Sequence, residues 1–238
     1  MWVGGEKRLY SIENGDIAHT FEIPSSCGGI TALFSDKDGV LWVGTKASGL
    51  AVFAENSFKF VNAAPSGEIR TVTSFGEDSD GELWFGTKSY GFCIAKKSGY
   101  AGSMFEDDIV ENIVSDKSGN VWLNTLKSGI VRISPDGEKT VLSGKKESFT
   151  TIFVDFFNNI WASSKNSGLF VAQKNQEFRP VKDLFANSAD FFPTVANIFF
   201  EDFDGSIFVN DLENPSSFFV LKLTELRKGL IFQPEMKK

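Results

Sequence analysis

The chain has 238 residues, 42% of them hydrophobic, which is the composition of a globular fold with one or two cores. Its 24 basic and 31 acidic residues give a net charge of -7 without any basic run, and this excludes electrostatic binding to nucleic acid or to anionic lipid. No apolar stretch approaches the roughly 18 residues of a membrane helix, and the first residues lack the pattern of a signal peptide. We therefore expect no direct membrane insertion in this segment.

An aromatic residue recurs in six similar segments along the chain. In the last five segments the aromatic residue lies in a short apolar run that follows an Asp/Asn/Ser/Gly turn. Subtracting successive positions gives spacings of 40, 42, 38, 39 and 47. Six copies in register identify an internal repeat. The aromatic residues are Trp2, Trp42, Trp84, Trp122, Trp161 and Phe208.

Each complete repeat predicts four short strands. In the second repeat they fall at residues 30–35, 41–44, 50–54 and 58–61, separated by turns rich in Asp, Ser and Gly. A period near 40 residues with four strands in each unit is typical of a β-propeller blade. The sequence therefore predicts an all-β fold, a β-propeller of about six four-stranded blades. An aspartate lies six residues before the aromatic in each of the five full repeats: Asp36, Asp78, Asp116, Asp155 and Asp202.

The first copy of the repeat is incomplete. Its three strands are expected at residues 2–4, 9–12 and 17–23, because Trp2 belongs to a second strand and no inner strand precedes it. We expect a single propeller domain over residues 1–238 that is a fragment of a longer propeller. The alternative is a six-bladed ring with one three-stranded blade. The expected blades cover residues 1–24, 25–63, 64–106, 107–143, 144–183 and 184–238.

Residues 30–50 and 72–92 carry the pattern I-x-x-[IL]-x-x-D-x-x-G-x-[LI]-W-[VF]-G-T-x-x-x-G-[LF] best, and this pattern resembles the two-component regulator propeller repeat. The repeats that end at Ile130 and Leu169 match it more loosely, and the last repeat departs furthest. The resemblance implies a periplasmic sensor domain, a kinase or cyclase module downstream, and an oligosaccharide or other small-molecule ligand. It favours a non-enzymatic, ligand-sensing part of the extracytoplasmic sensor of a bacterial two-component regulator. The alternative is a stand-alone propeller that acts as a scaffold for protein–protein interactions.

Candidate catalytic and metal-binding residues are few. The single histidine, His19, is expected in an outermost strand, which is a poor position for a Ser-His-Asp triad. Streptogramin lyases resemble this repeat pattern, but that family depends on a channel-facing histidine, and none is expected here. With only two cysteines, Cys27 and Cys93, the chain lacks a zinc-binding cluster. The Asp-rich turns before each tryptophan are interpreted as turn chemistry rather than calcium loops. The sequence predicts no enzyme, no cofactor and no metal.

The candidate ligand site is the mouth of the propeller channel. A lysine recurs in the turns between the second and third strands, where it can meet an anionic ligand or merely solvate a hairpin. The turn lysines are Lys46, Lys88, Lys127 and Lys165, with Tyr90 beside the second. Polar residues recur near the start of the inner strands: Thr31, Thr73, Glu111, Thr150 and Asn197. The long connection 183–194 adds Phe191 and Phe192, which either contact a ligand or partner or pack on their own blade.

Overall fold

A computed structural model describes residues 1–61, 71–89, 91–96, 99–104, 108–142, 147–173, 177–184, 199–210, 218–226 and 229–237. The chain divides into two compact units. The first comprises residues 1–127 with 133–138, and the second comprises residues 128–132 with 139–238.

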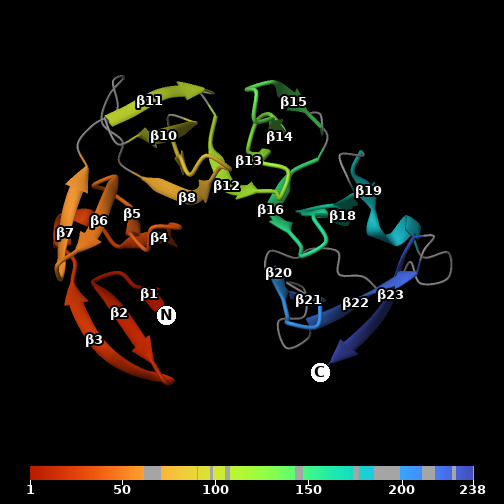
Figure 1. Cartoon of the computed structure of the whole chain (residues 1–238), viewed down its shortest axis with the longest axis horizontal. Coiled ribbons are helices and arrows are strands. Elements are labelled where there is room, and N and C mark those ends of the chain that lie inside the picture. The colour runs from red at the N-terminus through yellow and green to blue at the C-terminus, as the bar shows by residue number, and fades with distance from the viewer. Residues whose placement is uncertain are drawn as a thin grey trace. The chain divides into compact units, whose positions relative to one another are not determined.

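The described residues form six antiparallel sheets, in which strands that follow one another in sequence lie side by side (Figure 1). The first sheet has three strands, as expected: β1 (Trp2–Gly4), β2 (Arg8–Glu13) and β3 (Asp16–Glu22). The second sheet has four strands: β4 (Ile30–Ser35), β5 (Leu41–Thr45), β6 (Leu50–Ala54) and β7 (Ser57–Val61). The third sheet has four strands: β8 (Val72–Glu77), β9 (Leu83–Thr87), β10 (Phe92–Lys96) and β11 (Gly99–Met104). The fourth sheet also has four: β12 (Val110–Ser115), β13 (Val121–Thr125), β14 (Gly129–Ile133) and β15 (Lys139–Val141).

The last two sheets repeat the four-stranded plan, so the all-β, blade-like architecture predicted from the repeats is confirmed. The fifth sheet consists of β16 (Phe149–Val154), β17 (Ile160–Ser164), β18 (Gly168–Ala172) and β19 (Arg179–Pro180). The sixth consists of β20 (Phe199–Glu201), β21 (Ser206–Asn210), β22 (Phe218–Leu226) and β23 (Gly229–Lys237). Two short 3-10 helices, η1 (Ser25–Cys27) and η2 (Val181–Leu184), lie in the described connections.

The recurrent aspartate ties the first turn of a blade to its tryptophan. Asp36 Oδ1 accepts hydrogen bonds from the backbone N–H groups of Asp38 and Val40, and Asp36 Oδ2 accepts a bond of 2.8 Å from Trp42 Nε1. Gly39 completes this turn with a φ of 80°, a conformation that suits glycine. The same aspartate-to-indole bond, also 2.8 Å long, recurs at Asp78–Trp84, Asp116–Trp122 and Asp155–Trp161. The six-residue spacing is therefore turn chemistry, as interpreted from the sequence.

The glycine two residues after the tryptophan makes room for the next sheet. A Cβ atom on Gly44 would lie 2.8 Å from Cγ1 of Val72, the first residue of β8. In the following repeat, a Cβ atom on Gly86 would lie 2.9 Å from Cγ1 of Val110, the first residue of β12. Contacts this short do not occur between real side chains, so glycine at this position lets the second strand of one sheet pack closely against the inner strand of the next.

Apolar side chains fill the spaces between successive sheets within each unit. One buried cluster joins Leu9 of β2 to Val43 and Ala51 of the second sheet, and another joins Leu50 to Val72 and Phe85 of the third. In the second unit, Trp161, Leu169 and Val171 pack against Val181 of η2 and against three residues of the sixth sheet, Ile207, Val209 and Leu221. Burial between blades is the main stabilising term in such a repeat.

The recurrence of tryptophan in short apolar runs predicts that it packs in the core between blades, and this is correct for three of the five. Trp84, Trp122 and Trp161 are buried, whereas Trp42 is half-buried. Trp2 contradicts the expectation, because 37% of its surface is exposed. Trp2 lies on β1, which pairs with β2. Its ring contacts Phe53, with centroids 5.5 Å apart.

Candidate functional site

The turns between second and third strands lie beside the segments that lead into the inner strands. Backbone N–H groups of these turns donate hydrogen bonds to the lead-in segments: Lys46 to Gly29 at 3.0 Å, Lys88 to Thr71 at 3.3 Å, Leu126 to Ile109 at 2.9 Å and Lys165 to Ser148 at 2.9 Å. Both kinds of segment therefore lie at the same end of a blade. In the first unit we call this surface the lysine face, defined as the turns at residues 5–7, 46–48, 88–89 and 126–127 with the lead-in segments 23–29, 71 and 108–109.

Each lead-in segment on the lysine face also bonds to the turn of the preceding blade. The N–H of Ile30 donates to the carbonyl of Gly5 at 3.1 Å. The hydroxyl of Thr71 donates to the carbonyl of Lys46 at 2.7 Å, while the carbonyl of Thr71 accepts from the N–H of Lys88. A group bound at one turn therefore touches a framework that continues into the next blade.

Asp108 makes the corresponding connection at the third step. Its carbonyl accepts a bond of 3.1 Å from the N–H of Gly91, and its Oδ1 accepts a bond of 2.8 Å from the N–H of Lys127. Its side chain is buried by these contacts. Because a buried carboxylate that accepts backbone N–H groups fixes their positions, Asp108 holds the turns of two successive blades in place.

The lysine side chains themselves are exposed. Lys46, Lys88 and Lys127 lie on the lysine face, and Lys165 occupies the equivalent turn in the second unit. These three lysines are exposed, whereas the side chain of Asp108 on the same face is buried. Exposed lysines of this kind can attract a multiply charged anion without being needed for the fold.

The polar residues of the inner strands have local partners. The hydroxyl of Thr31 donates to the carbonyl of Val72 at 2.6 Å, and the hydroxyl of Thr73 donates to the carbonyl of Val110, so both join successive inner strands. Thr150 donates to Ser163 within its own sheet at 3.2 Å, and Glu111 accepts from Asn124 at 3.4 Å. These contacts give the four residues a structural role.

Four of the expected site residues, Tyr90, Phe191, Phe192 and Asn197, lie outside the described residues. The structure therefore places eight of the twelve: the four lysines on the turns, and Thr31, Thr73, Glu111 and Thr150 on the inner strands.

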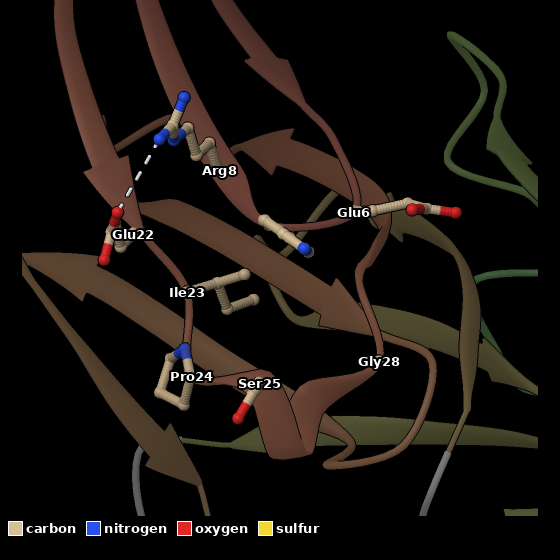
Figure 2. Close-up of a pocket in the computed structure, with 8 residues that line it drawn as sticks. Glu6, Arg8, Glu22, Ile23, Pro24, Ser25 and Gly28 are labelled. Atoms are coloured by element: carbon tan, nitrogen blue, oxygen red, sulfur yellow. Dashed lines mark ion pairs between the residues drawn. The ribbon is translucent and has the colours of Figure 1, made fainter.

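A cavity of about 740 Å³ opens on the lysine face beside the first sheet. Figure 2 shows Arg8 and Glu22 facing each other on neighbouring strands, with Pro24 and Ser25 on the connection that follows. Arg8 Nη2 and Glu22 Oε1 are 3.7 Å apart, and both side chains are more than half exposed, so water and salt screen the pair strongly. A Cβ atom on Gly28, which lines the cavity, would contact Lys46 at 3.5 Å. The cavity therefore adjoins the first turn lysine.

Sequence reasoning missed Glu6, Lys7 and Arg8 as site residues. The signal was present: Glu6 follows Trp2 by four residues, as Lys46 follows Trp42, and Lys7 follows Trp2 by five, as Lys127 follows Trp122. Lys7 and Arg8 bring two cations to the cavity, and Glu6 and Glu22 bring two carboxylates.

His19 lies on β3, the edge strand of the first sheet, where the sequence placed it. Its Nδ1 is 3.2 Å from Oγ of Ser11, which is 7% exposed and so is shielded from any substrate. In the described part of the chain, no three His, Cys, Asp or Glu side chains are grouped so that they could hold a metal ion. No helix among those same residues has both the length and the apolar character needed to cross a membrane.

Comparison with known structures supports the fold. The extracellular domain of BT4673 from B. thetaiotaomicron aligns with 98% of this chain at 19% identity and a TM-score of 0.70. It is described as a one component system in that structure and as a hybrid two component system in another. The chain spans about a third of its length, 34%.

Two lyases share the same architecture. A streptogramin B lyase aligns with 96% of the chain and 76% of its own length, at 14% identity and a TM-score of 0.71. A catalytically inactive virginiamycin B lyase from Staphylococcus aureus, determined with quinupristin, covers 95% of the chain and 75% of its own length at 13% identity and a TM-score of 0.70. Identities this low speak for the fold alone.

The sequence comparison is more specific. No curated protein matches the chain. The family described as two component regulator propeller matches residues 24–47 and 66–89, which contain the first two turn aspartates. Both matches lie in the repeats that carry the Trp-x-Gly-Thr pattern best. Residues 24–47 and 66–89 thus match two component regulator propeller repeats, and the chain has the β-propeller fold.

Proposed function

We propose that this propeller is a non-enzymatic, ligand-sensing part of the extracytoplasmic sensor of a bacterial two-component regulator. The observation that carries the proposal is the hydrogen-bonded framework of the lysine face. There, each lead-in segment bonds both to the turn of its own blade and to the turn of the blade before it. The repeat family and the likeness to extracellular domains of two component systems support the same reading.

The ligand that this face fits best is an anionic oligosaccharide. Lys46, Lys88 and Lys127 present exposed ammonium groups, and the adjoining cavity adds Lys7 and Arg8. A saccharide with a carboxylate on each unit spreads its charge over several residues, as the lysines are spread over several turns. Its hydroxyl groups can bond to Ser25 and to the carboxylates of Glu6 and Glu22, which line the same cavity.

Binding on this face has a direct route to signalling. A ligand that spans two turns stabilises whichever arrangement of neighbouring blades brings those turns to it, and it shifts the population toward that arrangement. In this proposal a module that follows the propeller, a kinase or a cyclase, responds to the shift. The rival proposal, a protein-interaction scaffold, expects no saturable binding of a small anion.

The test is a titration with an oligogalacturonate of six to eight units, followed by calorimetry, with the fully methyl-esterified oligomer as a neutral control. We expect saturable binding of the acidic oligomer only. Replacing Lys46, Lys88 and Lys127 together with glutamine is expected to weaken it at least about tenfold, since each lost ion pair contributes up to about 1 kcal/mol at an exposed site. Lys117→Gln, on a turn at the opposite end of the strands, is the matched control. Equal affinity of the triple variant and wild type would overturn the lysine-face proposal.

A further inference from the structure

A second cavity, of about 610 Å³, lies in the second unit at the turns between first and second strands. These turns are at the opposite end of the strands from the turn lysines. Four phenylalanines line it: Phe156 and Phe157 from the turn after β16, and Phe200 and Phe203 from β20 and the turn after it. Phe203 is fully exposed and Phe156 is 67% exposed. The rings of Phe156 and Phe157 stand nearly perpendicular, with centroids 5.6 Å apart, and form two walls of the cavity.

The fold does not require aromatic side chains at these positions. Phe156 and Phe203 each follow the turn aspartate of their repeat directly, and the earlier repeats carry Lys37, Ser79 and Lys117 at the same place. All five residues are exposed. Three repeats build the same turn with a polar residue there, so the exposed rings of the last two repeats serve something other than blade stability.

The first unit shows what the equivalent site accepts. There the N–H of Lys37 donates to Oε2 of Glu77 in the next blade at 3.1 Å. The ammonium of the same lysine lies 3.7 Å from Glu77 Oε1 and donates to the carbonyl of Asp80 at 3.2 Å. The chain thus places its own cation between an inner-strand glutamate and the next turn.

The second unit keeps the inner-strand glutamate as Glu201. The N–H of Phe156 donates to both carboxylate oxygens of Glu201, at 3.0 and 2.8 Å, where the N–H of Lys37 donates to one oxygen of Glu77. Asp204 occupies the place of Asp80. Phenylalanine stands where the lysine was, and none of the eight described residues that line the cavity is basic, whereas three are acidic: Glu201, Asp202 and Asp204.

From this exchange we propose that the cavity formed by Phe156, Phe157, Phe200 and Phe203 docks an arginine or lysine side chain of a partner polypeptide. A guanidinium or ammonium group placed against aromatic faces is attracted by the ring quadrupoles, and the neighbouring carboxylates add charge complementarity. The protruding ring of Phe203 needs an apolar residue of the partner beside the cation to cover it. The proposal is independent of the ligand on the lysine face.

The experiment uses a fluorescein-labelled peptide, Gly-Leu-Arg-Leu-Arg-Gly amide, and its Glu-for-Arg counterpart, titrated with the full chain and followed by anisotropy. We expect saturable binding of the arginine peptide only. Phe156→Lys restores the internal cation of the second blade, and we expect it to weaken binding at least about tenfold. Phe203→Ser, which introduces the serine of the third repeat, is expected to weaken binding severalfold. Ile17→Ser, which removes an exposed apolar side chain of the first sheet, is the matched control and is expected to leave the affinity for the arginine peptide unchanged.

Three results would overturn the proposal. The first is equal affinity of wild type, Phe156→Lys and Phe203→Ser for the arginine peptide, with all three folded by circular dichroism. The second is equal binding of the Glu counterpart, or no binding of either peptide. The third is displacement of the peptide by free arginine amide at the same concentration as by unlabelled peptide, which would indicate a small-cation site rather than a docking surface.

Discussion

Oδ2 of Asp116 accepts a hydrogen bond of 2.8 Å from Nε1 of Trp122, and both side chains are buried. Oδ1 of the same aspartate accepts the N–H groups of Ser118 and Asn120, so one carboxylate holds a turn and a core indole together. The sixth repeat shows the alternative. Phe208 cannot donate such a bond, and Asp202 Oδ1 accepts only the N–H of Phe203 among the contacts of the described residues.

Trp122→Phe is expected to reproduce the sixth repeat in the fourth and to lower the free energy of unfolding by about 1.5–3 kcal/mol. That is the value of a buried hydrogen bond to a charged acceptor. Urea unfolding followed by far-UV circular dichroism measures it. Asp38→Ala changes an exposed neighbour in an equivalent turn and is expected to stay within about 0.5 kcal/mol of wild type. If Trp122→Phe lowers the free energy of unfolding no more than Asp38→Ala does, the hydrogen bond from the indole is not what stabilises the turn.

Gly44→Ala is expected to destabilise the first unit by about 1–3 kcal/mol, because the new methyl group would overlap Cγ1 of Val72, 2.8 Å away. Val72→Ala removes the methyl group that clashes. The double variant should therefore be more stable than the sum of the two single effects by at least about 0.5 kcal/mol. If the change in the free energy of unfolding of the double variant equals the sum of the two single changes, the two blades do not approach as closely as the structure shows.

Thr73→Val removes the hydroxyl that joins β8 to the carbonyl of Val110 in β12 while it keeps the shape of the side chain. We expect a loss of about 1 kcal/mol in stability and no change in affinity for oligogalacturonate. The measurements are urea unfolding and calorimetry on the same sample. Weaker ligand binding at unchanged stability would reverse this assignment and return Thr73 to the ligand site.

Cys93 gives the protein a pH dependence above neutrality. Burial raises the pKa of its thiol from 9.0 to about 11, since a thiolate is poorly solvated inside the sheet. The folded pKa lies above the unfolded one, so this contribution to stability is complete below pH 9 and is lost as the pH rises toward 11. We expect Cys93→Ala to flatten the fall in melting temperature between pH 9 and 10.5. A fall as steep in the variant as in wild type would contradict the assignment.

Sequence reasoning reached the blade plan because its signals are local. The strand that begins at Ile30, the turn that contains Gly39 and the position of His19 on an edge strand all follow from spacing and turn chemistry within one repeat. Contacts between residues of different repeats could not be predicted in this way. The contacts of Thr71 with Lys46 and of Lys37 with Glu77 join residues 25 and 40 positions apart. No local pattern encodes such pairs, so the cavity beside Arg8 and the one beside Phe156 emerged only from the three-dimensional arrangement.

The most direct test of the sensing account is hydrogen–deuterium exchange of the full chain with and without saturating oligogalacturonate. Ligand on the lysine face should slow exchange at the amides of Lys46, Lys88 and Lys127 and in the lead-in segments beside them. The turns that contain Ser79 and Lys117, at the other end of the strands, should exchange as before. Protection confined to those opposite turns, or no protection anywhere, would contradict the account.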